Sequence, residues 1–163
     1  TMAAGLRAFK GVRRRMQLRG TAAGVSVYDD FAHHPTAIAE TLAGVRSAYP
    51  DRRIWAIFEP RSATSCRRVF QEDFARAFAA ADRIVLPAVF RSNLPDEQRL
   101  SAEQLVADLR ESGKDARYIP KVDDIVTAVA RDARNGDLVV VMSNGGFGGI
   151  HAKLLEALGR NGG

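Results

Sequence analysis

Short, almost uninterrupted runs of Val, Ile and Leu alternate with amphipathic segments along most of this 163-residue chain. Three of these runs are RIWAIF (53–58), RIVLPAV (83–89) and DLVVVMS (137–143). Strands that are apolar on both faces are typical of a parallel sheet covered by helices on each side. The pattern therefore predicts one α/β domain of three layers, with a mostly parallel sheet of about six strands and helices on both faces.

The spacing of the apolar residues also places the individual elements. Strands are expected at 14–20, 24–29, 53–58, 83–89, 116–119 and 137–143, with a turn at Gly20–Gly24 between the first two. Helices are expected at 35–48, 64–80, 102–112, 123–134 and 149–158. Pro35 suits the first position of its helix. A stripe of aromatic residues supports helix 64–80: Phe70, Phe74 and Phe78.

Composition argues against a membrane or disulfide-linked protein. No apolar run approaches the roughly 20 residues that a membrane-spanning helix needs, and no signal peptide is recognisable. The single cysteine, Cys66, cannot form a disulfide within the chain, which suits a reducing compartment. These features favour a cytoplasmic protein.

The net charge of +5 arises from one end of the chain. Residues 1–28 contain no acidic side chain and six basic ones: Arg7, Lys10, Arg13, Arg14, Arg15 and Arg19. Such a cluster indicates an anionic partner, and the alternative is a solvated basic strand. A basic nucleic-acid-binding module would need aromatic residues between the basic ones, and only Phe9 lies there.

Four unusual stretches each follow a predicted strand. They are DDFAHHP (29–35), EPRSATS (59–65), FRSNLP (90–95) and SNGGFGG (143–149). The carboxyl ends of strands form the edge at which open α/β sheets bind ligands. Each stretch could be a simple turn, but four on one edge favour a binding site.

The first stretch offers groups for an anionic or sugar-containing ligand. His33 lies at the start of a predicted helix, where backbone N–H groups and the helix dipole favour an anion. Asp30 could accept a hydrogen bond from a sugar hydroxyl. A zinc site is the competing interpretation, but only His34 and His151 could join His33, and no metal-binding spacing is present. A third possibility is that Asp29 and Asp30 only end a strand.

The last stretch is a glycine-rich turn that would let a ligand approach the backbone closely. It is neither a dinucleotide fingerprint nor a phosphate-binding P-loop, because the GxGxxG and GxxxxGK[ST] spacings are absent. The absence of the dinucleotide-binding fingerprint after the first predicted strand also argues against a nicotinamide-dependent oxidoreductase. Arg61 could bind a carboxylate or phosphate, or lie on the surface without a ligand. Cys66 has no base beside it in the sequence and is interpreted as structural.

Taken together, GVRRRMQ, VYDDFAHHPTAI, FEPRS and VVVMSNGGFGGIH resemble the C-terminal domain of the bacterial Mur ligases over nearly the whole chain. These ATP-dependent enzymes join amino acids or peptides to cell-wall precursors. RSATSCRR and SNGGFGG favour the peptidoglycan-recycling branch, which couples UDP-N-acetylmuramate to the tripeptide L-alanyl-γ-D-glutamyl-meso-diaminopimelate. The UDP-N-acetylmuramate–L-alanine ligase is the alternative.

The resemblance implies a Rossmann-like third domain at residues 1–163, with the UDP-sugar-binding and central ATPase domains outside this chain. It implies ATP and Mg²⁺ as cofactors, with most Mg²⁺ ligands in the central domain, and no catalytic or metal-binding residue here. It also implies that the isolated chain is inactive and that its partners are the two substrates and the other domains, not nucleic acid or membrane. The implied nucleotide-binding residues are Arg15, Asp30 and His33. The implied peptide-binding residues are Arg61, Asn144, Gly145 and Gly146.

Overall fold

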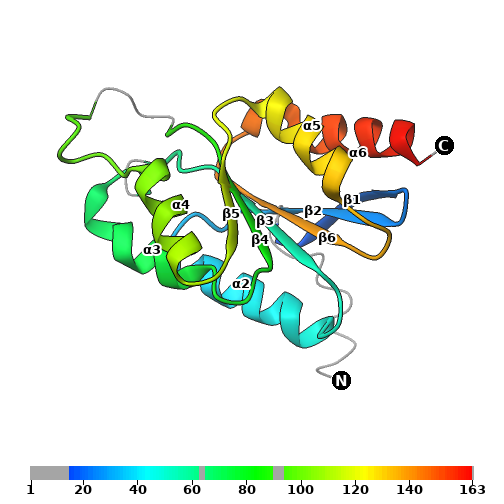
Figure 1. Cartoon of the computed structure of the whole chain (residues 1–163), viewed down its shortest axis with the longest axis horizontal. Coiled ribbons are helices and arrows are strands. Elements are labelled where there is room, and N and C mark those ends of the chain that lie inside the picture. Colours follow the sequence, from blue (N-terminus) through cyan, green and yellow to red (C-terminus); the bar gives the residue numbers. More distant parts are fainter. Residues whose placement is uncertain (1–14, 63–64, 90–93, 163) are drawn as a thin grey trace, which may run out of the picture.

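The computed structural model describes residues 15–62, 65–89 and 94–162. A six-stranded sheet runs through the centre in the order β1-β2-β6-β3-β4-β5, and all neighbours are parallel except β1 and β2 (Figure 1). The strands are β1 (Gln17–Ala22), β2 (Val25–Asp30), β3 (Ile54–Phe58), β4 (Arg83–Leu86), β5 (Asp115–Tyr118) and β6 (Leu138–Met142). The mostly parallel α/β sheet predicted from the sequence is confirmed.

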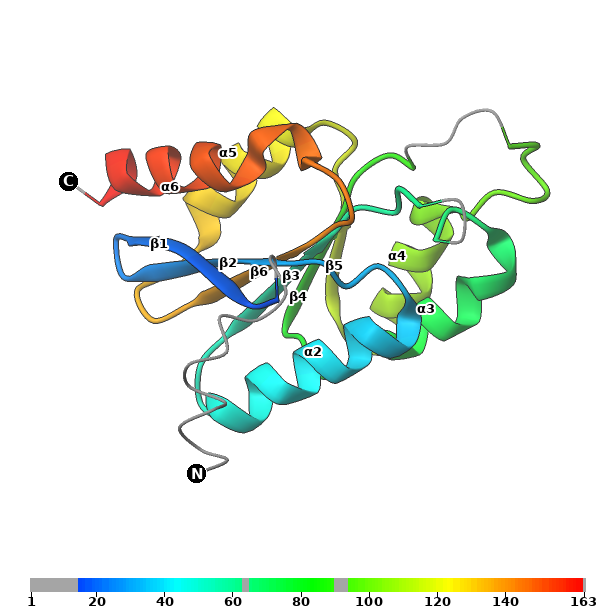
Figure 2. The same cartoon turned by 180° about the vertical axis from the view of Figure 1, so that it is seen from behind.

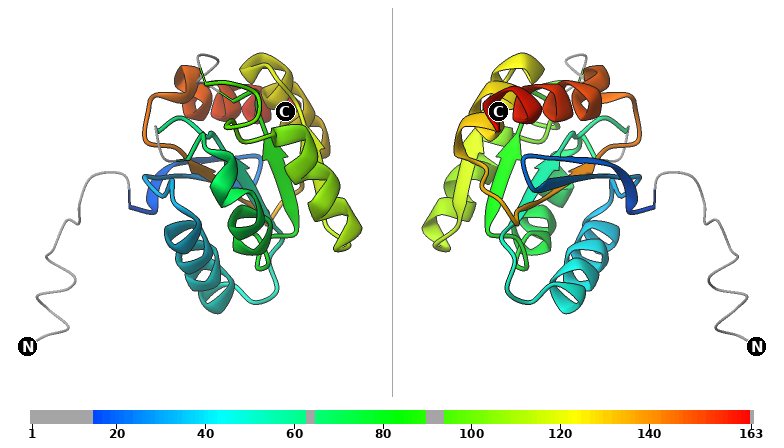
Figure 3. Two further views of the ribbon diagram at one scale, coloured as in Figure 1. Left: turned by 90° about the vertical axis from the view of Figure 1, so that its left-hand side faces the viewer. Right: turned by 90° about the vertical axis from the view of Figure 1, so that its right-hand side faces the viewer.

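Helices cover both faces of the sheet, which gives the predicted three layers (Figures 2 and 3). One face packs against α2 (Pro35–Ala48), α3 (Gln71–Ala77) and α4 (Ala102–Glu111). The other packs against α5 (Val122–Asp132) and α6 (Ile150–Asn161). Alternate residues of β6 point to opposite faces, so Val140 joins the first core and Val139 and Val141 join the second. No helix in the described part of the chain is long and apolar enough to cross a membrane.

The first two strands form a tight hairpin, and the predicted turn at Gly20–Gly24 is wrong in its extent. The turn is only Ala23 and Gly24, which have φ values of 52° and 75° and connect Ala22 directly to Val25. Two successive positive φ values suit the right-handed twist of a hairpin. Gly20 instead lies inside β1, where a Cβ would come 3.0 Å from the side chain of Leu155 in α6.

The helix predicted at 64–80 is also wrong in its extent. Residues 63 and 64 lie outside the described part, and α3 begins only at Gln71, after a short 3₁₀ helix η1 (Arg68–Phe70). The preceding residues bond to a distant segment instead of continuing a helix. The Arg68 N–H donates to the Gln98 carbonyl at 2.9 Å, and the Leu100 N–H donates to the Cys66 carbonyl at 2.8 Å. Phe74 and Phe78 are nevertheless buried, as the aromatic stripe predicted.

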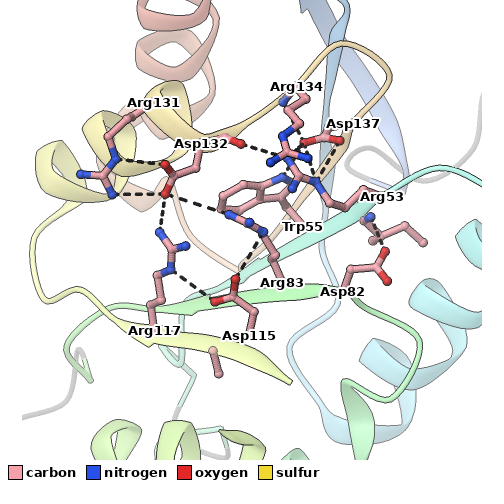
Figure 4. A network of polar contacts seen from close by, with 12 residues as sticks. Arg53, Trp55, Asp82, Arg83, Asp115, Arg117, Arg131, Asp132, Arg134 and Asp137 are labelled. Atoms are coloured by element: carbon pink, nitrogen blue, oxygen red, sulfur yellow. Dashed lines mark hydrogen bonds and ion pairs between the residues drawn. The ribbon is translucent and has the colours of Figure 1, made fainter. Parts of the chain in front are cut away.

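A network of ion pairs and hydrogen bonds between arginines and aspartates links the amino-terminal ends of the parallel strands (Figure 4). The carboxylate of Asp137 accepts hydrogen bonds from Arg53 at 2.6–3.1 Å, from Trp55 Nε1 at 2.9 Å and from the Arg134 N–H at 2.9 Å. Asp132 accepts from Arg117 at 2.6 Å and from Arg131 at 3.0 Å. Arg53 directly precedes β3 and Asp137 directly precedes β6. The network therefore lies at the amino-terminal ends of the strands, opposite their carboxyl ends.

This network makes stability depend on pH. Hydrogen bonds from Arg131 and Arg117 hold the pKa of Asp132 well below its usual range. Burial alone raises the pKa of Asp137, but Arg53, the Arg134 N–H and Trp55 together hold it below its usual value. A carboxylate with a lowered folded-state pKa stabilises the fold fully above its unfolded pKa of about 4, and loses that contribution as the pH falls.

We therefore expect the melting temperature of the chain to be level above about pH 5 and to fall steadily below about pH 4. Thermal unfolding followed by circular dichroism from pH 3 to pH 7 measures this. Asp137→Asn should give a lower and flatter profile, because it removes one of the titrating groups. An unchanged slope in that variant would show that other carboxylates carry the acid sensitivity.

Candidate functional site

Two adjacent aspartates are the last residues of β2, and their side chains line different clefts. Asp29 and Asp30 are both buried, with 2% and 4% of their surface exposed. Successive side chains of a strand point to opposite faces of the sheet. Asp30 accordingly contacts Thr41 of α2, whereas Asp29 lies 3.2 Å from His151 of α6. The strand end therefore separates an α2-side cleft from an α6-side cleft.

The α2-side cleft brings the three predicted nucleotide-binding residues together. Its volume is about 480 Å³. It is lined by Arg15, Met16, Asp30, Phe31, Ala32, His33, Ala37, Glu40 and Thr41. Arg15 supplies a guanidinium, His33 an imidazole and Phe31 an exposed aromatic ring. This set offers polar groups for phosphates or a sugar and an apolar surface for a base.

Asp30 shapes this cleft through its own hydrogen bonds. Its carboxylate accepts from the Met16 N–H at 2.9 Å, from the Ala32 N–H at 2.8 Å and from the Thr41 hydroxyl at 3.4 Å. These bonds tie the start of β1 and the loop after β2 to α2. An ionised carboxylate has about four acceptor positions, so one remains for a ligand hydroxyl.

His33 is held in a defined orientation. Its Nδ1 lies 2.9 Å from the Phe31 carbonyl, and its ring contacts the Phe31 ring edge to face with centroids 5.1 Å apart. Because a carbonyl only accepts, Nδ1 must carry the proton, which leaves Nε2 to accept a hydrogen bond, or to donate one when the ring is protonated. Asp30 and His33 thus have different structural roles. Asp30 holds β1, the loop after β2 and α2 together, and the His33 ring lines the cleft that they form.

The α6-side cleft contains a charged cluster that sequence reasoning missed. It has a volume of about 380 Å³ and is lined by Gln17, Arg19, Asp29, Gly145, Gly146, Gly149 and His151. His151 Nε2 lies 3.2 Å from one oxygen of Asp29, and Arg19 lies 3.5 Å from the other. The alternation of side chains along β2 was the available signal, because it separates Asp29 from Asp30.

The glycine-rich turn after β6 is fixed by buried polar and aromatic contacts. Ser143 donates to Glu59 at 2.7 Å, and the Gly145 N–H donates to the Ser143 hydroxyl at 3.0 Å. Phe147, Gly148 and Gly149 all have positive φ values, and the Phe147 side chain is buried. Glu59 was not predicted as part of the site, although its place after β3 indicated the right edge of the sheet.

The four predicted peptide-binding residues gather at this turn. Arg61 packs so closely on Gly145 that a Cβ there would lie 2.3 Å from Arg61 Cδ. Gly146 is exposed, and nothing lies within 4 Å of the Cβ position there. The Asn144 side-chain oxygen is buried and has no hydrogen-bond partner among the described residues. Such an oxygen could accept a hydrogen bond from a ligand N–H.

The alternative of a zinc site is not supported by the positions of the histidines. The three histidines proposed for zinc do not meet, because His33 lines the α2-side cleft, His151 lines the α6-side cleft and His34 contacts Phe70. Within the described ranges, no three His, Cys, Asp or Glu side chains are placed to hold a metal. Part of the basic cluster lies outside the described residues: Arg7, Lys10, Arg13 and Arg14. The same holds for residues 90–93 of the FRSNLP stretch.

Comparison with known proteins agrees with this architecture. The family described as "Mur ligase, glutamate ligase domain" matches residues 14–145. The UDP-N-acetylmuramate–L-alanyl-γ-D-glutamyl-meso-2,6-diaminoheptandioate ligase of Escherichia coli K12 is 43% identical over 156 residues, which cover 95% of this chain and 32% of that protein. The UDP-N-acetylmuramate–L-alanine ligase of Lachnospira eligens is 35% identical over 153 residues, which cover 94% of this chain and 33% of that protein.

A solved structure gives the same result. The murein peptide ligase of Psychrobacter arcticus 273-4 superposes with a TM-score of 0.78 at 39% identity, over 96% of this chain and 32% of that one. The chain therefore spans about a third of the length of the relatives it matches. The fold, the family match over residues 14–145 and the identities of 43% and 39% to these ligases agree. The chain therefore belongs to the Mur ligase family and corresponds to the C-terminal domain of those enzymes.

Proposed function

We propose that this chain is the third domain of an ATP-dependent ligase of the bacterial cytoplasm. The ligase would act in peptidoglycan recycling and join UDP-N-acetylmuramate to the tripeptide L-alanyl-γ-D-glutamyl-meso-diaminopimelate through an acyl phosphate. The observation that carries this proposal is the pair of clefts on either side of the β2 end. A nucleotide in one cleft and a peptide beside the other would meet at a single strand end.

The α2-side cleft fits ATP in the chemistry of its donor and acceptor groups. Arg15 would bind the phosphates, since a guanidinium forms strong charge-assisted bonds with phosphate oxygens. Asp30 would accept from a ribose hydroxyl with its remaining acceptor position, and His33 would contact the nucleotide through the edge of the ring that faces away from Phe31. We assign no Mg²⁺ ligand to this chain and place those ligands in the central domain.

The glycine-rich turn would receive the peptide. Arg61 would bind a carboxylate, and Asn144 and the backbone of Gly145 and Gly146 would contact the peptide's amide groups. The peptide's amine attacks the acyl phosphate carbon, and phosphate leaves. This chain's part is positioning the amine and excluding water when the domains close, so none of its residues needs to act as a nucleophile.

The experiment that tests the proposal is a comparison of acceptors in the full-length ligase. With ATP and UDP-N-acetylmuramate present, the enzyme should form the tripeptide product efficiently and ligate free L-alanine at most slowly. Product identity is measured by mass spectrometry. Ligation of L-alanine alone would assign the protein to the alanine-adding branch, which is the second candidate because of its 35% identity to that ligase.

The isolated 163-residue chain is expected to be inactive, because the P-loop spacing is absent from its sequence. Phosphate release from ATP is the measurement, with both substrates present. The full-length ligase serves as the positive control. Turnover by the chain alone that rises on addition of UDP-N-acetylmuramate and tripeptide would contradict the assignment of ATP hydrolysis to another domain.

A pair of glycine variants tests the placement of Arg61. Gly145→Ala should displace the Arg61 side chain, because the new Cβ would lie 2.3 Å from Arg61 Cδ. Gly159→Ala in α6 is the matched control, since that Cβ would also meet nothing within 4 Å and Gly159 has no proposed contact with the peptide. We expect KM for the tripeptide to rise by about tenfold in Gly145→Ala only, which corresponds to about 1.4 kcal/mol of lost binding. Equal KM values in the two variants would show that Arg61 does not bind the peptide from this position.

A further inference from the structure

A third pocket opens at the same edge of the sheet, beyond the two clefts and at the ends of β4 and β5. Its volume is about 490 Å³. Its walls come from the segment before α3, the ends of β4 and β5 and the start of α4. The polar side chains that line it are Arg68, Asp96, Arg99, Ser101, Glu103 and Tyr118. None of these residues was predicted as a site residue from the sequence, and none takes part in the proposed nucleotide and peptide contacts above.

The walls of this β4–β5 pocket are held by specific hydrogen bonds. The Arg68 N–H donates to the Gln98 carbonyl at 2.9 Å, which joins the segment before α3 to the segment before α4. The Gln71 side chain bonds to both backbone groups of Ser101, at 2.9 and 3.0 Å. At the strand ends, the Ile119 N–H donates to the Leu86 carbonyl at 2.9 Å, which joins the end of β4 to the residue after β5. The pocket is therefore formed before any ligand binds, which lowers the cost of binding.

The charges in the pocket are of both signs. Arg68 and Arg99 supply two guanidinium groups, and Asp96 and Glu103 supply two carboxylates. Arg99 is ion-paired with Asp96. Arg68 is exposed, and no ion pair joins it to another described residue. A purely anionic ligand would be repelled by the acids, so the pocket is better suited to a zwitterion, which carries an ammonium beside a carboxylate.

The tripeptide of the proposed function ends in such a group. In meso-2,6-diaminoheptanedioate two amino-acid head groups are joined by a short alkyl chain, and only one amino group is used in the peptide bond. The far head group keeps its ammonium and its carboxylate. L-Lysine in the same position would keep the ammonium and lack the carboxylate.

The distance along the sheet edge matches the length of this peptide. From the end of β6 to the ends of β4 and β5 is two to three strand spacings, or about 10–14 Å. Three extended residues span roughly 10 Å, and the γ-linkage and the alkyl chain of the third residue add several ångströms more. A peptide whose amine lies at the glycine-rich turn could therefore reach the β4–β5 pocket, whereas a single alanine could not.

We propose that the β4–β5 pocket binds the distal amino-acid head group of the peptide's third residue, with Arg68 on the carboxylate and Glu103 on the ammonium. The pocket then selects a diamino-diacid over lysine at this position. This inference rests on the proposed function, because it assumes that the enzyme ligates a peptide.

Two peptides and three variants of the full-length ligase test the proposal. The peptides differ only in carrying meso-diaminopimelate or L-lysine as the third residue. The wild type should prefer the first by about tenfold in kcat/KM, the value of one solvent-accessible charge-assisted contact. Arg68→Ala should lower kcat/KM about tenfold for the diaminopimelate peptide, leave the lysine peptide unchanged and so abolish the preference. Glu103→Gln should weaken both peptides, since both keep the ammonium.

Arg160→Ala is the control, because this exposed arginine pairs with Glu156 near the end of α6, away from the pocket. It should change neither peptide, and KM for ATP should stay constant in all three variants. A preference that survives Arg68→Ala, or an equal loss for both peptides, would overturn the inference while leaving peptide ligation intact. If the wild type ligates neither peptide and only L-alanine, the proposed function fails and this inference fails with it.

Discussion

Replacing Arg15 by alanine in the full-length ligase is expected to lower kcat/KM for ATP by about 30-fold or more. Arg15 lines the α2-side cleft together with Asp30 and His33, two residues before β1 begins. Closure of the domains over ATP would remove water from this guanidinium. Truncating a desolvated, charge-assisted contact costs about 2–5 kcal/mol, and each 1.36 kcal/mol is a factor of about ten in rate.

The control for Arg15 is again Arg160→Ala, which removes an exposed arginine from the far end of α6. Initial rates at varied ATP, with both other substrates saturating, give the comparison. The melting temperature of each variant should match the wild type, because Arg15 is exposed in this domain. A value of kcat/KM within about twofold of the control, well under 1 kcal/mol, would mean that Arg15 does not touch the nucleotide.

The second large effect is expected for the stability of the domain when Asp137 is replaced. Asp137→Ala should lower the free energy of unfolding by about 3 kcal/mol or more, because it leaves the Arg53 guanidinium without its carboxylate and the buried indole N–H of Trp55 without its acceptor. Arg53, Trp55 and the backbone of Arg134 all donate to this one carboxylate (Figure 4). For a domain of this length that loss corresponds to a melting temperature lower by roughly 6–12 °C.

Asp123→Ala is the matched control, because Asp123 forms an exposed ion pair with Lys153. Exposed pairs contribute at most about 1 kcal/mol. Thermal and urea unfolding of the 163-residue chain at pH 7 measure both variants. If Asp137→Ala and Asp123→Ala melt within about 2 °C of each other, less than 1 kcal/mol apart, the network is not a main source of stability.

The sequence predicted the elements best where local signals were strong. The helix expected at 35–48 has the bounds of α2, because Pro35 begins it and the apolar spacing of Ile38, Leu42 and Val45 continues to its end. The apolar runs likewise predicted β3 and β6 within one residue at each end. Local spacing reports how one segment packs against the core, and that information is contained in the segment itself.

Failures occurred where a distant segment decides the outcome. The helix expected at 64–80 is shortened because residues 66–68 bond to residues 98–100, and no local pattern reveals that pairing. The Ser143–Glu59 bond links residues 84 apart. The contact between Asp29 and His151 joins β2 to α6 in the same way. The edge of the sheet that carries the site could thus be predicted, but the partners of its side chains could not.

The central claim is that the β2 end separates a nucleotide from a peptide. A crystal structure of the full-length ligase with a non-hydrolysable ATP analogue and the tripeptide tests this most directly. We expect the ribose and phosphates in the α2-side cleft, within hydrogen-bond distance of Asp30 and Arg15, and the peptide's amine at the glycine-rich turn near Gly145. Nucleotide density over the glycine-rich turn, with the α2-side cleft empty and Arg15 directed into solvent, would contradict the account.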